Sequence, residues 1–195
     1  MKKLLVIIIL SLCFITSSQA DDIRDFKIEG ISVGDSLLDH YSENEIKNAN
    51  TVYYPKSRKF YQIAFLTTTS ETYDAININL KKGDNKYIVY SIKGLKDYDN
   101  KYKECLQENE KIVDEILSIV KNTKETSYKS DYVNEFGNSY ATGSKFEVYD
   151  GTFTAYCAKW DKENEKVISM KWIDTLNVII ALSEWMDWLN TEAYK

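Results

Sequence analysis

Residues 145–160 decide the fold class, and they read KFEVYDGTFTAYCAKW. Apolar and polar side chains alternate on both sides of Asp150-Gly151, a pair of residues typical of a tight β-turn. The stretch predicts an antiparallel hairpin, with one strand over Lys145–Tyr149 and the other over Thr152–Trp160.

The same alternation extends the predicted sheet in both directions along the chain. Further strands are expected over 26–31, 60–65, 76–80, 87–92, 167–173 and 176–182. The strands over 76–80 and 87–92 flank the turn Lys82–Asn85, and the later strands follow one another through short polar turns. Strands joined as hairpins favour a mostly antiparallel sheet.

Helices are predicted between these strands. The clearest runs from about Lys101 to Lys121, where apolar residues recur at helical spacing and Asp97–Asn100 offer N-caps. Ser42 and Glu45 form a capping box that predicts a helix from Glu43.

Two further helices are expected at Gly34-Asp35, leading to Leu37 and Tyr41, and after a Ser183 cap, with Trp185 and Trp188 on one side. The sequence therefore predicts an α+β fold, with roughly three helices packed on a mostly antiparallel sheet.

Residues 1–20 have the order of a secretory signal peptide: Lys2 and Lys3, an apolar run, and then small residues up to Ala20. We expect cleavage before Asp21, which leaves residues 21–195 as a single α+β domain in the periplasm or outside the cell. A lipoprotein reading at Cys13 is the alternative, but it puts a bulky leucine where a small residue is required.

The charge of the chain excludes some classes of partner. Without Lys2 and Lys3, the 25 basic residues fall to 23 against 30 acidic ones, a net charge of about −7. An acidic chain without a basic cluster outside its leader is unsuited to nucleic acid or anionic lipid. No stretch after the leader is apolar enough to span a bilayer.

Cys105 and Cys157 remain after the leader, and in an oxidising compartment they predict a disulfide between the long helix and a strand. Closing a loop of this length stabilises the fold by about 4 kcal/mol in the loop-entropy model. Two free buried thiols are the alternative. A catalytic thiol is disfavoured because the chain has one histidine, His40, which is distant in sequence.

Gly34-Asp35-Ser36-Leu37 resembles the motif of a large family of secreted esterases in which the serine is the nucleophile. That family also has a C-terminal Asp-x-x-His motif that supplies the base, and no histidine follows His40 here. A hydrolase using Ser36 therefore stays a minor alternative. The expected role of Asp35 and Ser36 is to face the amides of a first helical turn.

No metal or other cofactor is expected from the sequence. His40 has no second histidine with which to share a transition metal. The acidic residues Asp97, Asp99, Glu104 and Glu108 lack the order of a calcium loop and are read as caps and solvated surface. Trp185 and Trp188 are expected in the core, because the polar side of their helix is acidic.

The fifteen tyrosines are the compositional sign of a recognition surface. Tyr53, Tyr54, Phe136 and Tyr140 fall outside the strongly periodic segments and are the candidate binding surface. Tyrosine is also a favoured strand residue, so a structural role remains the alternative.

Three segments, 28–39, 183–188 and 190–194, carry a resemblance to uncharacterised small secreted proteins from AT-rich marine bacteria. The resemblance implies secretion and adds no catalytic residue. More loosely, a glycine-led helix beside antiparallel strands is similar to periplasmic inhibitor and outer-membrane assembly modules of the β-lactamase-inhibitor type, an analogy of fold that does not give function.

These observations favour a non-enzymatic secreted or periplasmic domain that binds an unknown protein or small ligand of the cell envelope. The alternatives are the hydrolase using Ser36 and an envelope assembly or structural factor.

Overall fold

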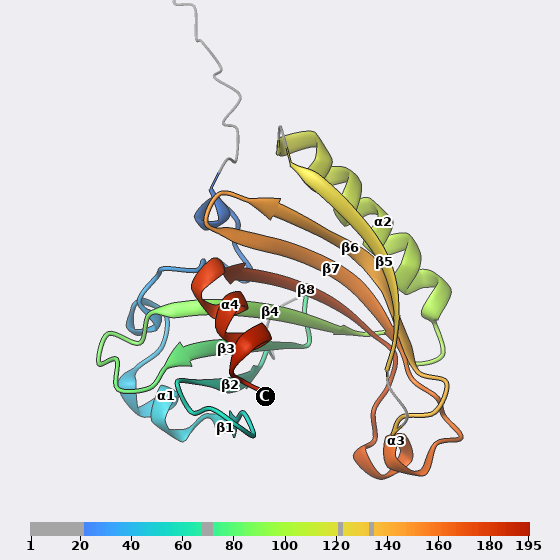
Figure 1. Cartoon of the computed structure of the whole chain (residues 1–195), viewed down its shortest axis with the longest axis horizontal. Coiled ribbons are helices and arrows are strands. Elements are labelled where there is room, and N and C mark those ends of the chain that lie inside the picture. Colours follow the sequence, from blue (N-terminus) through green and yellow to red (C-terminus); the bar gives the residue numbers. More distant parts are fainter. Residues whose placement is uncertain (1–21, 68–71, 121–122, 133–134) are drawn as a thin grey trace, which may run out of the picture.

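An eight-stranded antiparallel sheet runs through the molecule, and helices pack on both of its faces (Figure 1). The computed structural model describes residues 22–67, 72–120, 123–132 and 135–195. The expected signal peptide, residues 1–20, lies outside the described residues. The α+β class with a mostly antiparallel sheet is confirmed.

The strands are β1 Asn50–Tyr53, β2 Phe60–Leu66, β3 Ala75–Lys81, β4 Val89–Asp97, β5 Lys124–Asp131, β6 Tyr140–Val148, β7 Gly151–Lys159 and β8 Thr175–Leu182. The helices are α1 Glu43–Asn48, α2 Tyr102–Ile119, α3 Glu165–Met170 and α4 Ser183–Thr191, with 3-10 turns η1 Ile23–Asp25 and η2 Leu37–Asp39.

The sheet consists of two four-stranded meanders in the order β1-β2-β3-β4-β8-β7-β6-β5. After β4, helix α2 carries the chain to the far edge of the sheet, where β5 begins. The chain then returns strand by strand until β8 pairs with β4, with Ile92 opposite Ile180. Every pair of neighbouring strands is antiparallel, including the pair β4–β8 that joins the two meanders.

One face of the sheet, here called the α2 face, is apolar from strand to strand. A row of side chains crosses it in register, from Ile78 through Ile92 and Ile180 to Phe153 and Phe146. All five are buried, under α2 and the N-terminal segment. Alternation along each strand places these residues on one side, where burial of apolar area stabilises the fold.

The predicted disulfide is present on the α2 face. Cys105 of α2 is bonded to Cys157 of β7, with an S–S distance of 1.94 Å and a Cα–Cα distance of 6.1 Å. Both residues are fully buried. The bond joins the helix to the sheet.

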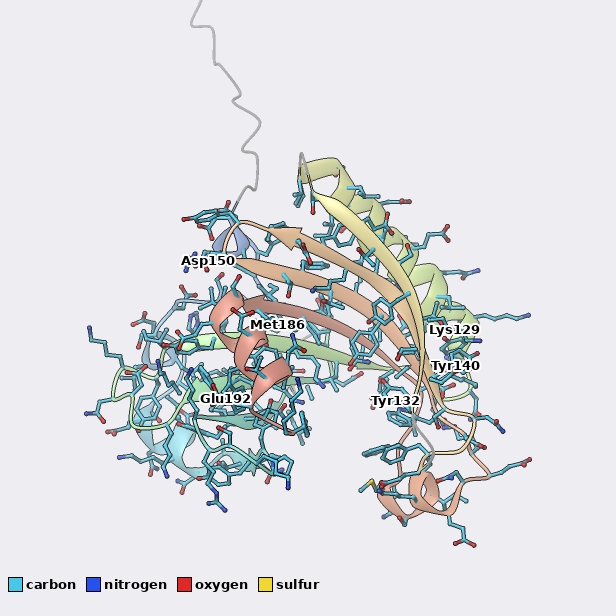
Figure 2. The ribbon with its side chains drawn as sticks, in the orientation of Figure 1. Lys129, Tyr132, Tyr140, Asp150, Met186 and Glu192 are labelled. Atoms are coloured by element: carbon cyan, nitrogen blue, oxygen red, sulfur yellow. A yellow bond between two sulfur atoms is a disulfide. The ribbon has the colours of Figure 1, made fainter. Side chains whose placement is uncertain are left out.

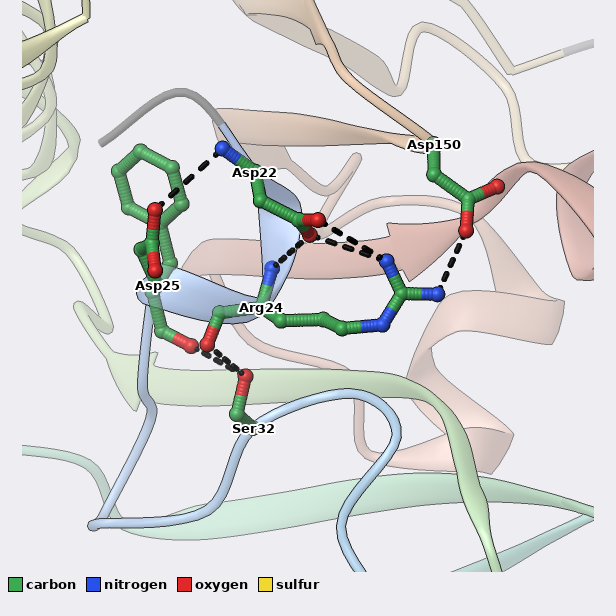
Figure 3. Close-up of polar contacts among 6 residues, drawn as sticks. Asp22, Arg24, Asp25, Ser32 and Asp150 are labelled. Atoms are coloured by element: carbon green, nitrogen blue, oxygen red, sulfur yellow. Dashed lines mark hydrogen bonds and ion pairs between the residues drawn. The ribbon is translucent and has the colours of Figure 1, made fainter. Parts of the chain in front are cut away.

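Polar contacts hold the N-terminal segment to the sheet (Figure 3). The Arg24 guanidinium donates to the Asp22 carboxylate at 3.0 Å and to Asp150 in the β6–β7 turn. The buried Ser32 hydroxyl donates to the carbonyls of Arg24 and Phe26. The two Ser32 bonds satisfy backbone carbonyls that no strand pairs.

The opposite face, here called the α4 face, is partly covered by α4 (Figure 1). Trp185 and Trp188 of α4 are buried against Phe60 and Ala181, as expected for core residues. The helix follows β8 directly and folds back over the centre of the sheet. Its N-cap is Leu182 and no side chain caps it, so the predicted Ser183 cap is wrong.

Two predicted strands are wrong, for local reasons. Residues 26–31 form a tight turn with one bridge between Ile28 and Ile31, because Glu29 and Gly30 have positive φ angles of 52° and 79° that a strand does not allow. Residues 167–170 belong to helix α3 instead, because the Asn164 side chain accepts from two amides at the start of that helix.

Other elements also differ from the predicted ones in type, cap or extent. The helix expected at Gly34-Asp35 is only the 3-10 turn η2, whereas the capping box of Ser42 and Glu45 does begin α1. Helix α2 has no side-chain cap, although Asp97–Asn100 offered one. The edge strands β1 and β5 were missed because polar residues dominate them and no clear alternation marks them.

Candidate functional site

The α4 face differs from the α2 face in the side chains that its strands present. One row runs across the strands from Gln62 to Asn79 and Ser91, and the next row pairs Lys93 with Ile179. Alternation places all of these on the face opposite the apolar rows. Polar side chains therefore lie over the centre of the sheet, where α4 folds back above them.

A pocket of about 290 Å³ lies between these rows and α4, and we call it the α4-face pocket. Its lining residues come from the sheet, from the segment after β1 and from α4 with the C-terminal residues. They are Tyr54, Gln62, Asn79, Ser91, Lys93, Tyr156, Ile179, Trp185, Leu189 and Tyr194.

Lys93 is the charged residue of the pocket lining. Burial lowers the pKa of Lys93 below the ordinary lysine value. No ion pair to Lys93 exists among the described residues, although eleven other ion pairs do. Lys93 is half-buried, and a cation that is partly removed from water without a counter-ion costs stability. Ionisable groups of this kind are found more often at functional sites than elsewhere.

Two more polar atoms of the pocket lining have no partner. The Ser91 hydroxyl and the Trp185 indole N–H make no hydrogen bond within the described part of the chain, and their residues are only 1% and 6% exposed. Trp188, three residues further along α4, does have one, because its indole donates to the Ser57 hydroxyl at 2.9 Å. Buried polar groups are nearly always paired, so these two groups at the pocket are open to a hydrogen bond with a ligand.

Tyrosines close the sides of the pocket. The Tyr54 hydroxyl donates to Asn79 Oδ1 at 2.8 Å, and the Tyr54 ring packs edge-on against Trp188 and Tyr194. Burial raises the pKa of both Tyr54 and Tyr156, so these phenols stay neutral at physiological pH. They provide flat walls without adding negative charge.

The arrangement suits binding more directly than catalysis. Lys93, Ser91 and Trp185 are all hydrogen-bond donors, and no carboxylate lines the pocket. Apolar contact comes from Ile179 and Leu189. A donor-rich pocket with apolar walls fits a small organic molecule that carries an acceptor.

The four residues of the predicted binding surface do not form one patch. Tyr54 lines the α4-face pocket, whereas Tyr53 lies outside it, 49% exposed, with the Arg58 guanidinium 5.0 Å from its ring centre. Tyr140 begins β6 and Phe136 lies between β5 and β6, so both are in the other half of the sheet. Phe136 packs on tryptophans and Tyr140 on Tyr102.

A second, more polar hollow of about 490 Å³ lies near Tyr132 and Tyr140. Figure 2 shows these two tyrosines near α3, away from Met186 of α4 and from Glu192, which follows that helix. Two polar groups of this hollow have partners: Lys129 lies 4.3 Å from the Tyr140 ring centre, and the Ser139 hydroxyl is bonded to Phe136 and Asp161. It gives no comparable sign of a ligand.

The structure places Ser36 as the N-cap of η2. Its hydroxyl donates to the Lys86 carbonyl at 2.7 Å and accepts from the Leu38 amide. His40 lies 3.7 Å from the Asp35 carboxylate, and none of the contacts found among the described residues joins His40 to Ser36. This geometry supports a structural role for Ser36, as the cap of η2.

Two of the four acidic residues considered for calcium form ion pairs with lysines. Asp99 pairs with Lys162 at 2.7 Å, and Glu108 pairs with Lys111 at 3.3 Å. Within the described ranges, no group of three or more His, Cys, Asp or Glu side chains is placed to hold a metal ion. No helix of that part of the chain has the length and apolar character needed to cross a membrane.

Sequence reasoning missed Ser91, Lys93 and Trp185 as site residues. The only signal was the alternation Tyr90-Ser91-Ile92-Lys93, which is also typical of a strand with one solvated face. Comparison of the chain with protein-family models, with curated proteins and with solved structures gave no match.

Proposed function

We propose that this chain is a non-enzymatic binding domain that works outside the cytoplasm and holds a small organic molecule in the α4-face pocket. The observation that carries the proposal is the pair of buried, unpartnered groups in that pocket, the Ser91 hydroxyl and the Trp185 indole N–H, beside the Lys93 ammonium. The buried disulfide supports an oxidising compartment.

The polar groups of the pocket have a stability cost that a ligand would offset. An unpaired buried donor costs about 1–3 kcal/mol, and a buried charge more. Apolar residues of similar size would remove that cost from the free protein. Retaining groups that lower stability is the usual compromise at a binding site.

The Trp185 indole N–H is a built-in reporter of occupancy. The chain has four tryptophans, so a ¹⁵N–¹H spectrum resolves each indole separately. One-ring compounds fit the pocket volume, and we would titrate benzoate, benzamide, benzyl alcohol and benzylamine. At least one of them should shift the Trp185 signal while leaving that of Trp188, which already donates to Ser57, nearly unchanged.

A pocket-filling variant provides the control. Leu189→Phe adds volume within the pocket lining, and the matched Leu117→Phe adds the same volume at an exposed position of α2. The shift should disappear in Leu189→Phe and persist in Leu117→Phe. If no compound moved the Trp185 signal, or if the shift survived in Leu189→Phe, the proposal would be wrong.

A further inference from the structure

We infer that the ligand of the α4-face pocket is a small monocarboxylic acid with an apolar body about the size of one ring. This inference rests on the proposed function of the same pocket and adds the chemical class of the ligand.

The first argument is the kind of polar group that the pocket offers. Ser91 and Lys93 lie two residues apart on β4, on the same face, and Trp185 faces them from α4. The Lys93 ammonium and the Trp185 indole only donate, and the Ser91 hydroxyl has no bond of its own. An ionised carboxylate only accepts, and its two oxygens have room for several donors.

The second argument is charge. The lining contains one cation and no acidic side chain. The neighbouring Glu184 of α4 is bound instead by Lys81 at 2.9 Å and by Lys59 at 3.7 Å. A single negative charge therefore completes the pocket, whereas phosphate is usually held by arginine forks or several cations.

The third argument is size and shape. A volume of about 290 Å³ is at the lower end for a small-molecule site, so the occupant is smaller than a dinucleotide or a long-chain lipid. Ile179 and Leu189 line the pocket together with the rings of Tyr54 and Tyr156. These walls suit a flat or short apolar body behind the carboxylate.

The test compares benzoate with benzamide and benzylamine, which share the ring and differ in charge. Dissociation constants come from the shift of the Trp185 indole signal in the full mature protein. Benzoate should bind with a Kd on the order of 1 mM, as suits so small a ligand. Benzamide should bind about tenfold more weakly, and benzylamine weaker still, because a charge-assisted bond is lost or becomes repulsive.

Matched variants separate the binding role of each donor from its structural role. Lys93→Met should weaken the binding of benzoate about 10-fold to 100-fold and leave the binding of benzamide nearly unchanged. Lys96→Met, on the same strand but the other face, should change neither constant. Trp185→Phe should also weaken benzoate binding, and the shift of backbone amides near Ser91 measures the binding in this variant. Trp188→Phe should lower stability and leave the affinity for benzoate unaltered.

The outcomes distinguish this inference from the proposed function. Benzamide or benzylamine binding as tightly as benzoate, with the Trp185 signal shifting, would overturn the carboxylate class and leave the pocket as a ligand site. Equal loss of benzoate and benzamide in Lys93→Met would also overturn it. No response to any of the three compounds at concentrations well above 1 mM would overturn both proposals.

Discussion

The two faces of the sheet are built from alternate residues of the same strands, yet they have different compositions. On β4 and β8, Ile92 and Ile180 point to the α2 face, whereas Lys93 and Ile179 point to the α4 face. The α2 face is apolar, buried and joined to its helix by a disulfide. The α4 face keeps polar groups under a short helix, some of them without partners.

The difference teaches where stability and function reside in this molecule. A dry, well-packed face contributes most of the folding free energy, and changes to it are costly. A face with unpaired donors contributes less and is free to exchange partners. The same type of substitution should therefore change stability by different amounts on the two faces.

The largest effect is expected at the disulfide. Replacing Cys105 and Cys157 together by serine should lower the free energy of unfolding by about 4 kcal/mol, because the bond limits the freedom of the unfolded chain. Urea denaturation measures the change. In the parent protein, thiol titration under denaturing conditions should find neither cysteine free, and two free thiols in protein from an oxidising compartment would contradict the bond.

The next largest loss of stability is expected when an isoleucine is truncated, and its size should differ between the two faces. Ile92→Ala should cost about 3–4 kcal/mol, because Ile92 is fully buried on the α2 face and a cavity remains. Ile179→Ala should cost about 1–2 kcal/mol, because Ile179 is partly exposed and already borders the pocket. Urea denaturation of both variants checks this. Equal costs would show that the α4 face is packed as tightly as the α2 face.

A smaller change, a gain in stability rather than a loss, is expected when Lys93 is replaced. Lys93→Met should raise the melting temperature by about 2–4 °C, corresponding to about 1 kcal/mol, because it removes a cation without an ion pair from a half-buried site. Lys96→Met, on the α2 face of the same strand, is the control and should not stabilise. Calorimetry of the ligand-free proteins gives the values.

This stabilisation depends on pH in a defined direction. The pKa of Lys93 is lowered in the folded protein, so between that value and the ordinary one the unfolded chain binds more protons. Stability of the parent protein relative to Lys93→Met should therefore rise with pH across this window. The advantage of Lys93→Met is greatest below the folded pKa and vanishes above the ordinary value. A constant difference would mean that Lys93 is not desolvated.

The smallest effect is expected at Ser36, away from both faces. Ser36→Ala should cost no more than about 1 kcal/mol, the scale of a lost N-cap. The parent protein should show no turnover of short acyl esters above background. Turnover that disappeared in both Ser36→Ala and His40→Ala, with folding intact, would favour the hydrolase alternative.

Local chemistry explains which elements were predictable. Helix α2 and strands β2, β3, β7 and β8 carry a strong period of apolar residues, so their type follows from the residues alone. The capping box of α1 is equally local. Strand β5 has no such period, and α3 owes its start to a cap at Asn164 in a stretch whose composition also suits a strand.

The pairing of Cys105 with Cys157 was also determined by the sequence, because only these two cysteines follow the predicted leader. The candidate site was not. Nothing in the residues around Lys93 distinguishes a lysine on a solvated strand face from one in a pocket, since alternation assigns a side without saying what covers it. Only the fold brings α4 back over β4 and β8, and with it Trp185 over Ser91 and Lys93, because that placement depends on contacts between residues nearly 100 positions apart.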